Sequence, residues 1–110
     1  MKKLVLLITL LCAGLVVAQA EAKTTDGEVV AATGMECSDY FVVKTDDGYA
    51  VLEWYSGYKP DEGDKVSGEF GLFGYRDISV QPGGANIHAW VEDYGLSLDD
   101  ANDKLKGKCN

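Results

Sequence analysis

The residues that could carry chemistry in this 110-residue chain are one histidine, three cysteines and many carboxylates. Catalysis of the Ser-His-Asp kind would have to use His88, but no Ser stands in a Gly-x-Ser-x-Gly turn. A single imidazole also rules out metal sites built on several histidines. We therefore interpret His88 as a structural or surface residue and expect a protein that is not an enzyme. A small hydrolase is the least favoured alternative.

Eight of the eighteen carboxylates stand in adjacent pairs, which suggests two kinds of site. Glycosidases need two carboxylates across a cleft, and a chain of this length offers little room for one. Calcium is a better match for the loop that carries Asp61, Glu62 and Asp64, although the EF-hand spacing is missing. The simplest interpretation is that these acids keep the protein soluble. We expect no metal and no other cofactor.

The first twenty residues have the pattern of a cleavable signal peptide. Lys2 and Lys3 precede an apolar run over residues 4–18, and Ala18-Gln19-Ala20 fits the small-x-small pattern of a cleavage site. The run has fifteen residues, fewer than the roughly 20 that span a bilayer. A lipid anchor at Cys12 is disfavoured because no small residue directly precedes it. We expect a periplasmic or secreted protein without stable membrane insertion after cleavage.

Removal of residues 1–20 makes the chain more acidic. Two of ten basic residues are lost and none of the eighteen acids, so the net charge changes from −8 to −10. Nucleic-acid binding depends on Lys and Arg that neutralise phosphates. The sequence therefore excludes nucleic acids and anionic membrane surfaces as expected partners.

Cleavage would also leave an even number of cysteines, Cys37 and Cys109. In an oxidising compartment such a pair favours a disulfide bond, with two buried free thiols as the alternative. The bond would close a loop of about 73 residues and stabilise the fold by roughly 4 kcal/mol on the chain-entropy model. No Cys-x-x-Cys spacing supports thiol exchange or a cysteine-based zinc site.

Short strand-like runs separated by Gly, Asp and Pro predict one small all-β domain over residues 21–110. The expected strands cover residues 28–33, 40–45, 49–55, 65–70, 75–80 and 87–92. The step from Asp47 to Gly48 predicts a tight hairpin turn between the second and third strands.

The end of the chain changes to a helical period. Ser97 can cap a helix that ends before Gly107. Leu98, Ala101 and Leu105 share one face of this helix, which must cover another surface.

Side-chain alternation predicts that the hairpin has an unusually apolar outer face. The inward residues are Phe41, Val43, Thr45, Ala50, Leu52 and Trp54, and the outward ones include Tyr40, Val42, Tyr49, Val51 and Tyr55. One explanation is that the C-terminal helix packs on this face. The other is that Tyr40, Tyr49 and Tyr55 form an aromatic binding platform, and both can hold at once.

The segment Gly63-Asp64-Lys65-Val66-Ser67-Gly68 resembles the entry to the fourth strand of an OB-fold. The order of elements over residues 26–80 is similar to that of small exported bacterial OB-fold proteins. The resemblance implies a mainly β, five- to six-stranded OB-like barrel, here followed by a C-terminal α-helix. The loop after the third run is too short for the helix usual in that fold, and an SH3-like barrel or a small sandwich are the alternatives.

The resemblance implies ligands on the face of the second and third strands and at the adjoining loops. Together with the aromatic residues in loops, it gives the candidate ligand-binding residues Tyr40, Tyr49, Tyr55, Tyr58, Phe73 and Tyr75. Aromatic surfaces with few cations suit sugars, peptides or proteins better than polyanions. The sequence thus predicts a non-enzymatic exported module that binds a protein, peptide or glycan of the cell envelope. The alternative is a secreted acidic inhibitor of an enzyme.

Overall fold

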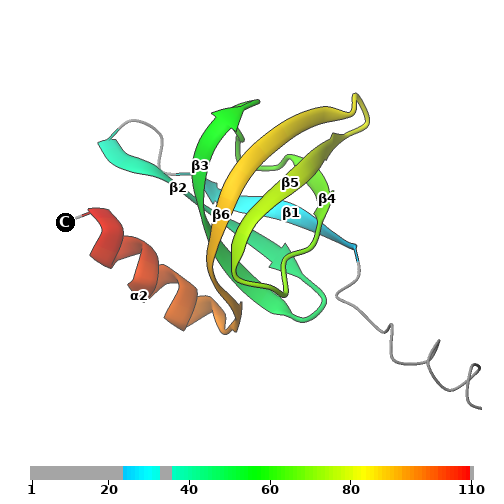
Figure 1. Cartoon of the computed structure of the whole chain (residues 1–110). Helices are drawn as coiled ribbons and strands as arrows, with labels where there is room; N and C mark the ends of the chain where they lie inside the picture. The colour runs from blue at the N-terminus through cyan, green and yellow to red at the C-terminus, as the bar shows by residue number, and fades with distance from the viewer. Residues whose placement is uncertain (1–23, 33–35, 110) are drawn as a thin grey trace, which may run out of the picture.

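The computed structural model describes residues 24–32 and 36–109. In this part of the chain the elements are β1 (Thr25–Ala32), β2 (Glu36–Thr45), β3 (Gly48–Gly57), β4 (Lys65–Gly68), β5 (Gly74–Gln81), β6 (Ala85–Leu96) and α2 (Leu98–Cys109) (Figure 1). All six expected strands are present, with ends shifted by a few residues. The proposed signal peptide lies outside the described residues.

The strands form one closed antiparallel barrel in the order β1-β2-β3-β6-β5-β4, closed by pairing between β1 and β4 (Figure 1). Two meanders, β1 to β3 and β4 to β6, make up the two halves, and β3 pairs with β6 between them. This architecture confirms the prediction of a small β-barrel with a C-terminal helix, and it is compatible with an OB-like fold.

The barrel interior is filled by the side chains that the alternation predicted to point inward. Phe41, Val43 and Leu52 are almost completely buried and join residues from all six strands in one apolar cluster. Each such side chain contributes about 1.5–3 kcal/mol through removal of apolar surface from water. The alternating pattern of β2 and β3 is therefore confirmed.

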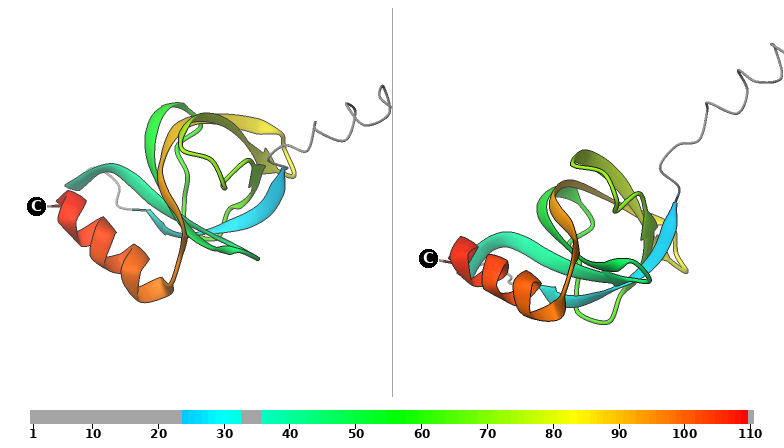
Figure 2. Two further views of the ribbon diagram at one scale, coloured as in Figure 1. Left: turned by 60° about the horizontal axis from the view of Figure 1, so that its bottom comes forward. Right: turned by 90° about the horizontal axis from the view of Figure 1, so that it is seen from below.

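Helix α2 lies against the outside of the barrel and contacts β2, β3 and the end of β6 (Figure 2). Ser97 caps it, since its Oγ accepts a hydrogen bond from the backbone N–H of Asp100 at 3.1 Å. Ala101 is fully buried against Val42 and Val51. The helix thus covers part of the outer face of the hairpin, as the first explanation of that face predicted.

The predicted end of the helix before Gly107 is wrong, because α2 continues to Cys109. Glycine costs about 1 kcal/mol in a helix interior relative to alanine. Contacts to β6 hold the last turns in place, with Lys104 Nζ 3.4 Å from Asp93 Oδ2 and Lys108 Nζ 3.4 Å from Glu92 Oε1. In the described residues no helix is both long and apolar enough to cross a membrane.

Candidate binding surfaces

Three aromatic rings from three strands form an exposed row on the outside of the barrel. The ring centroids of Tyr55 and Tyr75 are 5.0 Å apart, and those of Tyr75 and Trp90 are 4.9 Å apart. Both pairs are edge to face, with interplanar angles of 83° and 90°. The three residues remain 46%, 57% and 36% exposed, respectively. We call Tyr55, Tyr75 and Trp90 the aromatic strip.

Strand register brings the strip together. Tyr75 of β5 is paired with Trp90 of β6, and Trp90 is in turn paired with Glu53 of β3. The β3–β6 register shifts between Trp54 and Ser56, which makes Tyr55 the extra residue of a bulge. Bulges bend a strand and re-aim its side chains. This bulge lies where the Tyr55 ring contacts the ring of Tyr75.

The hydroxyl groups of the strip are linked as well as the rings. A hydrogen bond with Tyr75 is the main reason why the pKa of Tyr55 rises from 10.0 to about 12, with desolvation and the Glu53 charge adding to it. The hydrogen bond therefore favours the protonated Tyr55 hydroxyl over the phenolate. At neutral pH the Tyr55 end of the strip carries no phenolate charge.

Replacement of Tyr75 by Phe is expected to lower the pKa of Tyr55 toward 10, because the hydrogen bond is removed while the ring contact remains. The folded-state pKa lies above the unfolded-state value, so the interaction stabilises the fold below pH 10 and is lost as the pH rises through about 12. The measurement is an alkaline NMR titration of protein with ¹³C-labelled tyrosine.

The matched control for this titration is Tyr58→Phe. A hydrogen bond with Asp64 is the main cause of the raised pKa of Tyr58, so this variant should leave the Tyr55 titration unchanged. An unchanged Tyr55 pKa in the Tyr75→Phe protein would contradict the proposed link between the two hydroxyls.

The six predicted aromatic residues do not form one surface. Tyr40 and Tyr49 are half-buried and pack in the cluster beneath α2. The Nζ of Lys108 lies 5.3 Å from the centre of the Tyr40 ring. Burial is the main cause of the raised pKa of Tyr40, and the charges of Glu53 and Glu92 add to it. Tyr40 and Tyr49 thus attach the helix to the barrel, whereas Tyr55 and Tyr75 belong to the strip.

Tyr58 stands apart from the strip, on the loop after β3. Its backbone carbonyl accepts a hydrogen bond from Trp54 Nε1 at 3.0 Å. The Nζ of Lys59 lies 4.3 Å from the Trp54 ring centre and forms an ion pair with Asp39. These contacts hold the loop close to the barrel while the Tyr58 side chain stays 37% exposed.

Phe73 contacts a different aromatic residue, Tyr94, with ring centroids 4.8 Å apart. It is the most exposed large hydrophobic side chain among the described residues, at 59%. Arg76 supports this turn, because its guanidinium donates hydrogen bonds to the carbonyl oxygens of Phe73 and Tyr75. Phe73 therefore lies between the strip and the end of the barrel that Tyr94 helps to line.

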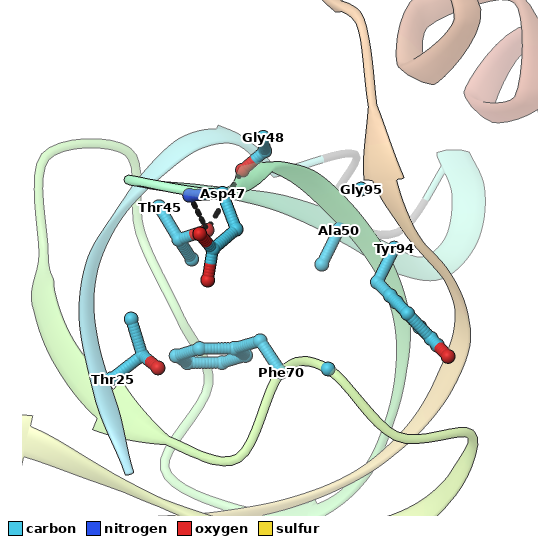
Figure 3. Close-up of a pocket in the computed structure, with 9 residues that line it drawn as sticks. Thr25, Thr45, Asp47, Gly48, Ala50, Phe70, Tyr94 and Gly95 are labelled. Atoms are coloured by element: carbon cyan, nitrogen blue, oxygen red, sulfur yellow. Dashed lines mark hydrogen bonds between the residues drawn. The ribbon is translucent and has the colours of Figure 1, made fainter. Parts of the chain in front are cut away.

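A cavity of about 240 Å³ opens at that end of the barrel (Figure 3). We call it the mouth cavity. Its lining comes from the start of β1, the end of β2, the start of β3 and the turn between them, the β4–β5 loop and the end of β6. It consists of Thr25, Thr45, Asp47, Gly48, Ala50, Phe70, Gly71, Tyr94 and Gly95. The mouths of β-barrels are frequent ligand sites. None of these residues was among the sequence-based candidates.

His88 lies on the outer surface beside the strip, two residues before Trp90. Its Nδ1 pairs with Asp77 Oδ1, and both side chains are well exposed.

In the loop that was considered for calcium, Asp64 Oδ2 accepts a hydrogen bond from the backbone N–H of Asp61 at 2.9 Å, so one carboxylate is used within the loop. Among the described residues there is no cluster of His, Cys, Asp or Glu suited to a metal ion.

Two aromatic contributors to these surfaces, Trp90 and Tyr94, were not among the residues predicted from the sequence. Trp90 carried a signal that could have identified it, because it occupies an outward position of a strand whose inward neighbours, Ala89 and Val91, are apolar.

No protein-family model, curated protein or solved structure matches this chain.

Proposed function

We propose that this chain is a non-enzymatic binding module, exported to the periplasm or secreted, that recognises a polypeptide partner through the aromatic strip. The observation that carries the proposal is the contact of three exposed rings, Tyr55, Tyr75 and Trp90, across three strands. Tyr and Trp are enriched at the energetic centres of protein interfaces, where their large rings are removed from water. The amino-terminal pattern and the resemblance to small exported bacterial OB-fold proteins support an envelope location.

Ring geometry favours a polypeptide over a glycan. Sugars stack on flat ring faces, whereas the neighbouring rings of the strip are nearly perpendicular and present edges and faces in alternation. Protein side chains can pack into such an uneven surface. Because each strand of the barrel already pairs with two neighbours, recognition must come from side chains rather than from an added strand.

The charge around the strip indicates a basic partner. Glu53 lies beside Tyr55, and the exposed Asp77 follows Tyr75 by two residues. The whole chain carries a net charge of −8. Complementary charge speeds association and selects among partners. We therefore propose a partner surface that combines apolar side chains with Lys or Arg.

The test is site-specific photo-crosslinking in cells that produce the full chain. With p-benzoyl-phenylalanine in place of Tyr75, ultraviolet light should yield a polypeptide adduct, and the additional substitution Trp90→Ala should reduce its yield at least fivefold. Asp103 on the exposed side of α2 is the control position and should give no such adduct.

A photo-crosslinking probe at Glu62 distinguishes binding through the strip from the alternative function, an acidic inhibitor of an enzyme. An acidic inhibitor would bind its enzyme through the exposed loop of Asp61 and Glu62, and it would crosslink from position 62 with strong dependence on salt. Adducts from position 62 alone, or equal adducts from positions 75 and 103, would contradict binding through the strip. An adduct sensitive to glycosidase would indicate a glycan and also contradict the proposal.

A further inference from the structure

The mouth cavity combines a carboxylate with apolar and aromatic walls. Phe70 and Ala50 are 3% and 2% exposed and form its inner surface, and Tyr94 flanks it. Among the residues that line it, none is a Lys, Arg or His, and the one charged side chain is Asp47. The cavity is therefore apolar inside and negative at its rim.

Asp47 is held in position by the β2–β3 turn. Its backbone N–H donates a hydrogen bond to Thr45 Oγ1 at 3.1 Å, and the same hydroxyl donates to the carbonyl oxygen of Gly48 at 2.9 Å. Gly48 has a φ of +120°, which a residue with a side chain adopts only with strain. Figure 3 shows the Asp47 side chain directed across the opening toward the Phe70 ring.

The Asp47 carboxylate has no hydrogen-bond or ion-pair partner among the described residues, so its charge is available to a ligand. A cation between this carboxylate and the Phe70 ring would gain an ion pair and a cation–π contact. An anion would be repelled, and a neutral apolar molecule would gain only the apolar walls. Charge and lining together select for a cation with an apolar surface.

We propose that the mouth cavity binds a small methylated ammonium group. Methyl groups spread the positive charge and weaken hydration, so such a group enters an apolar cavity at lower cost than a primary ammonium does. Aromatic side chains recognise quaternary ammonium ions in this way. Pockets for drug-sized ligands measure about 300–1,000 Å³, so the cavity of about 240 Å³ suits a group of choline size. This inference does not depend on the aromatic strip.

The experiment is an NMR titration of the purified protein with choline and with its neutral isostere, in which carbon replaces nitrogen. Choline should shift the amide signals of Gly48, Gly71 and Gly95, which lie around the mouth, and bind at least tenfold more tightly than the isostere. Ionic strength is held constant with sodium chloride. Equal binding of the two compounds, or shifts confined to residues outside the mouth, would overturn the proposal, as would the absence of binding.

Two matched variants assign the site. Asp47→Asn keeps the size of the side chain but removes the charge, and it should weaken choline binding at least tenfold. Asp46→Asn removes the same charge from the same turn but lies outside the cavity lining, so it should change the affinity less than twofold. If both variants lost choline affinity equally, the general negative potential of the protein would explain the effect, and a site at Asp47 would be contradicted.

The same ammonium group occurs on free choline and on phosphatidylcholine headgroups. Cosedimentation with phosphatidylcholine vesicles distinguishes these sources. Choline binding without vesicle binding would identify a free small molecule, and binding of both would identify a headgroup that reaches the mouth cavity. Either result supports the proposed chemistry, whereas vesicle binding that persists in the Asp47→Asn protein would contradict it.

Discussion

Reduction of the purified protein is expected to lower its free energy of unfolding by about 4 kcal/mol, because we predict a disulfide between Cys37 and Cys109 that closes a loop of about 73 residues. The side chains of both cysteines lie outside the described residues, but their neighbours support the pairing. The Nζ of Lys108, next to Cys109, lies 5.3 Å from the ring centre of Tyr40, three residues after Cys37. The carboxyl end of α2 is thus held at the first half of β2 (Figure 1).

Denaturant unfolding with and without reductant measures this effect, and the double variant with Cys37→Ser and Cys109→Ser is its control. The variant should match the reduced protein and should not respond to reductant. Intact mass should increase by two hydrogen atoms on reduction. Alkylation of either thiol in the unreduced, folded protein would contradict the prediction.

Local sequence patterns predicted the barrel well because they report on a single strand or turn. The two-residue alternation of Phe41 and Val43 with outward neighbours reflects burial on one face, and the structure confirms it. The step from Asp47 to Gly48 predicted the hairpin because Gly48 needs a positive φ. The helix cap at Ser97 was likewise visible in four consecutive residues.

The candidate surfaces depend on register between distant strands, which no local pattern encodes. Trp90 meets Tyr75 because β5 and β6 pair in one particular register, and Tyr55 joins them through a bulge. The mouth cavity needs Asp47 of the β2–β3 turn, Phe70 of the β4–β5 loop and Tyr94 near the end of β6, which meet only when the barrel closes. Sequence reasoning could therefore name aromatic residues but could not sort them into surfaces.

The same limit explains why the sequence did not predict which aromatic residues of the hairpin α2 covers and which stay exposed to solvent. Helical periodicity indicated that α2 must cover an apolar surface, and the hairpin offered one. It could not indicate that Tyr40 and Tyr49 would be covered while Tyr55 stayed 46% exposed. That outcome is set by where the short connection after β6 delivers the helix, beside β2 and β3 (Figure 2).

Substitution of Ala101 by Asp is expected to detach α2 from the barrel and destabilise the protein by roughly 3 kcal/mol, because the new carboxylate would be buried without a partner. Ala101 is fully buried and packs against Val42 and Val51. This contact lies in a cluster separate from the barrel interior, so the barrel should remain folded. Hydrogen exchange in α2 should accelerate while exchange at core positions such as Leu52 changes little.

Asn102→Asp is the matched control, since it adds the same charge to the exposed side of the same helical turn. Its effect should stay within about 0.5 kcal/mol. If Ala101→Asp left the exchange rates of α2 unchanged, the helix would not depend on this contact. If it accelerated exchange at Leu52 equally, helix and barrel would unfold as one unit and the separation of the two clusters would be wrong.

The effect of losing the disulfide and the effect of Ala101→Asp should also be coupled. With the disulfide intact, a detached α2 stays tethered next to β2 at high effective concentration, so Ala101→Asp releases it only in part. In the Cys37→Ser and Cys109→Ser background the same substitution should accelerate exchange in α2 further and expose Tyr40 and Tyr49 to solvent. Additive effects in the combined variant would contradict a disulfide that holds this helix on the barrel.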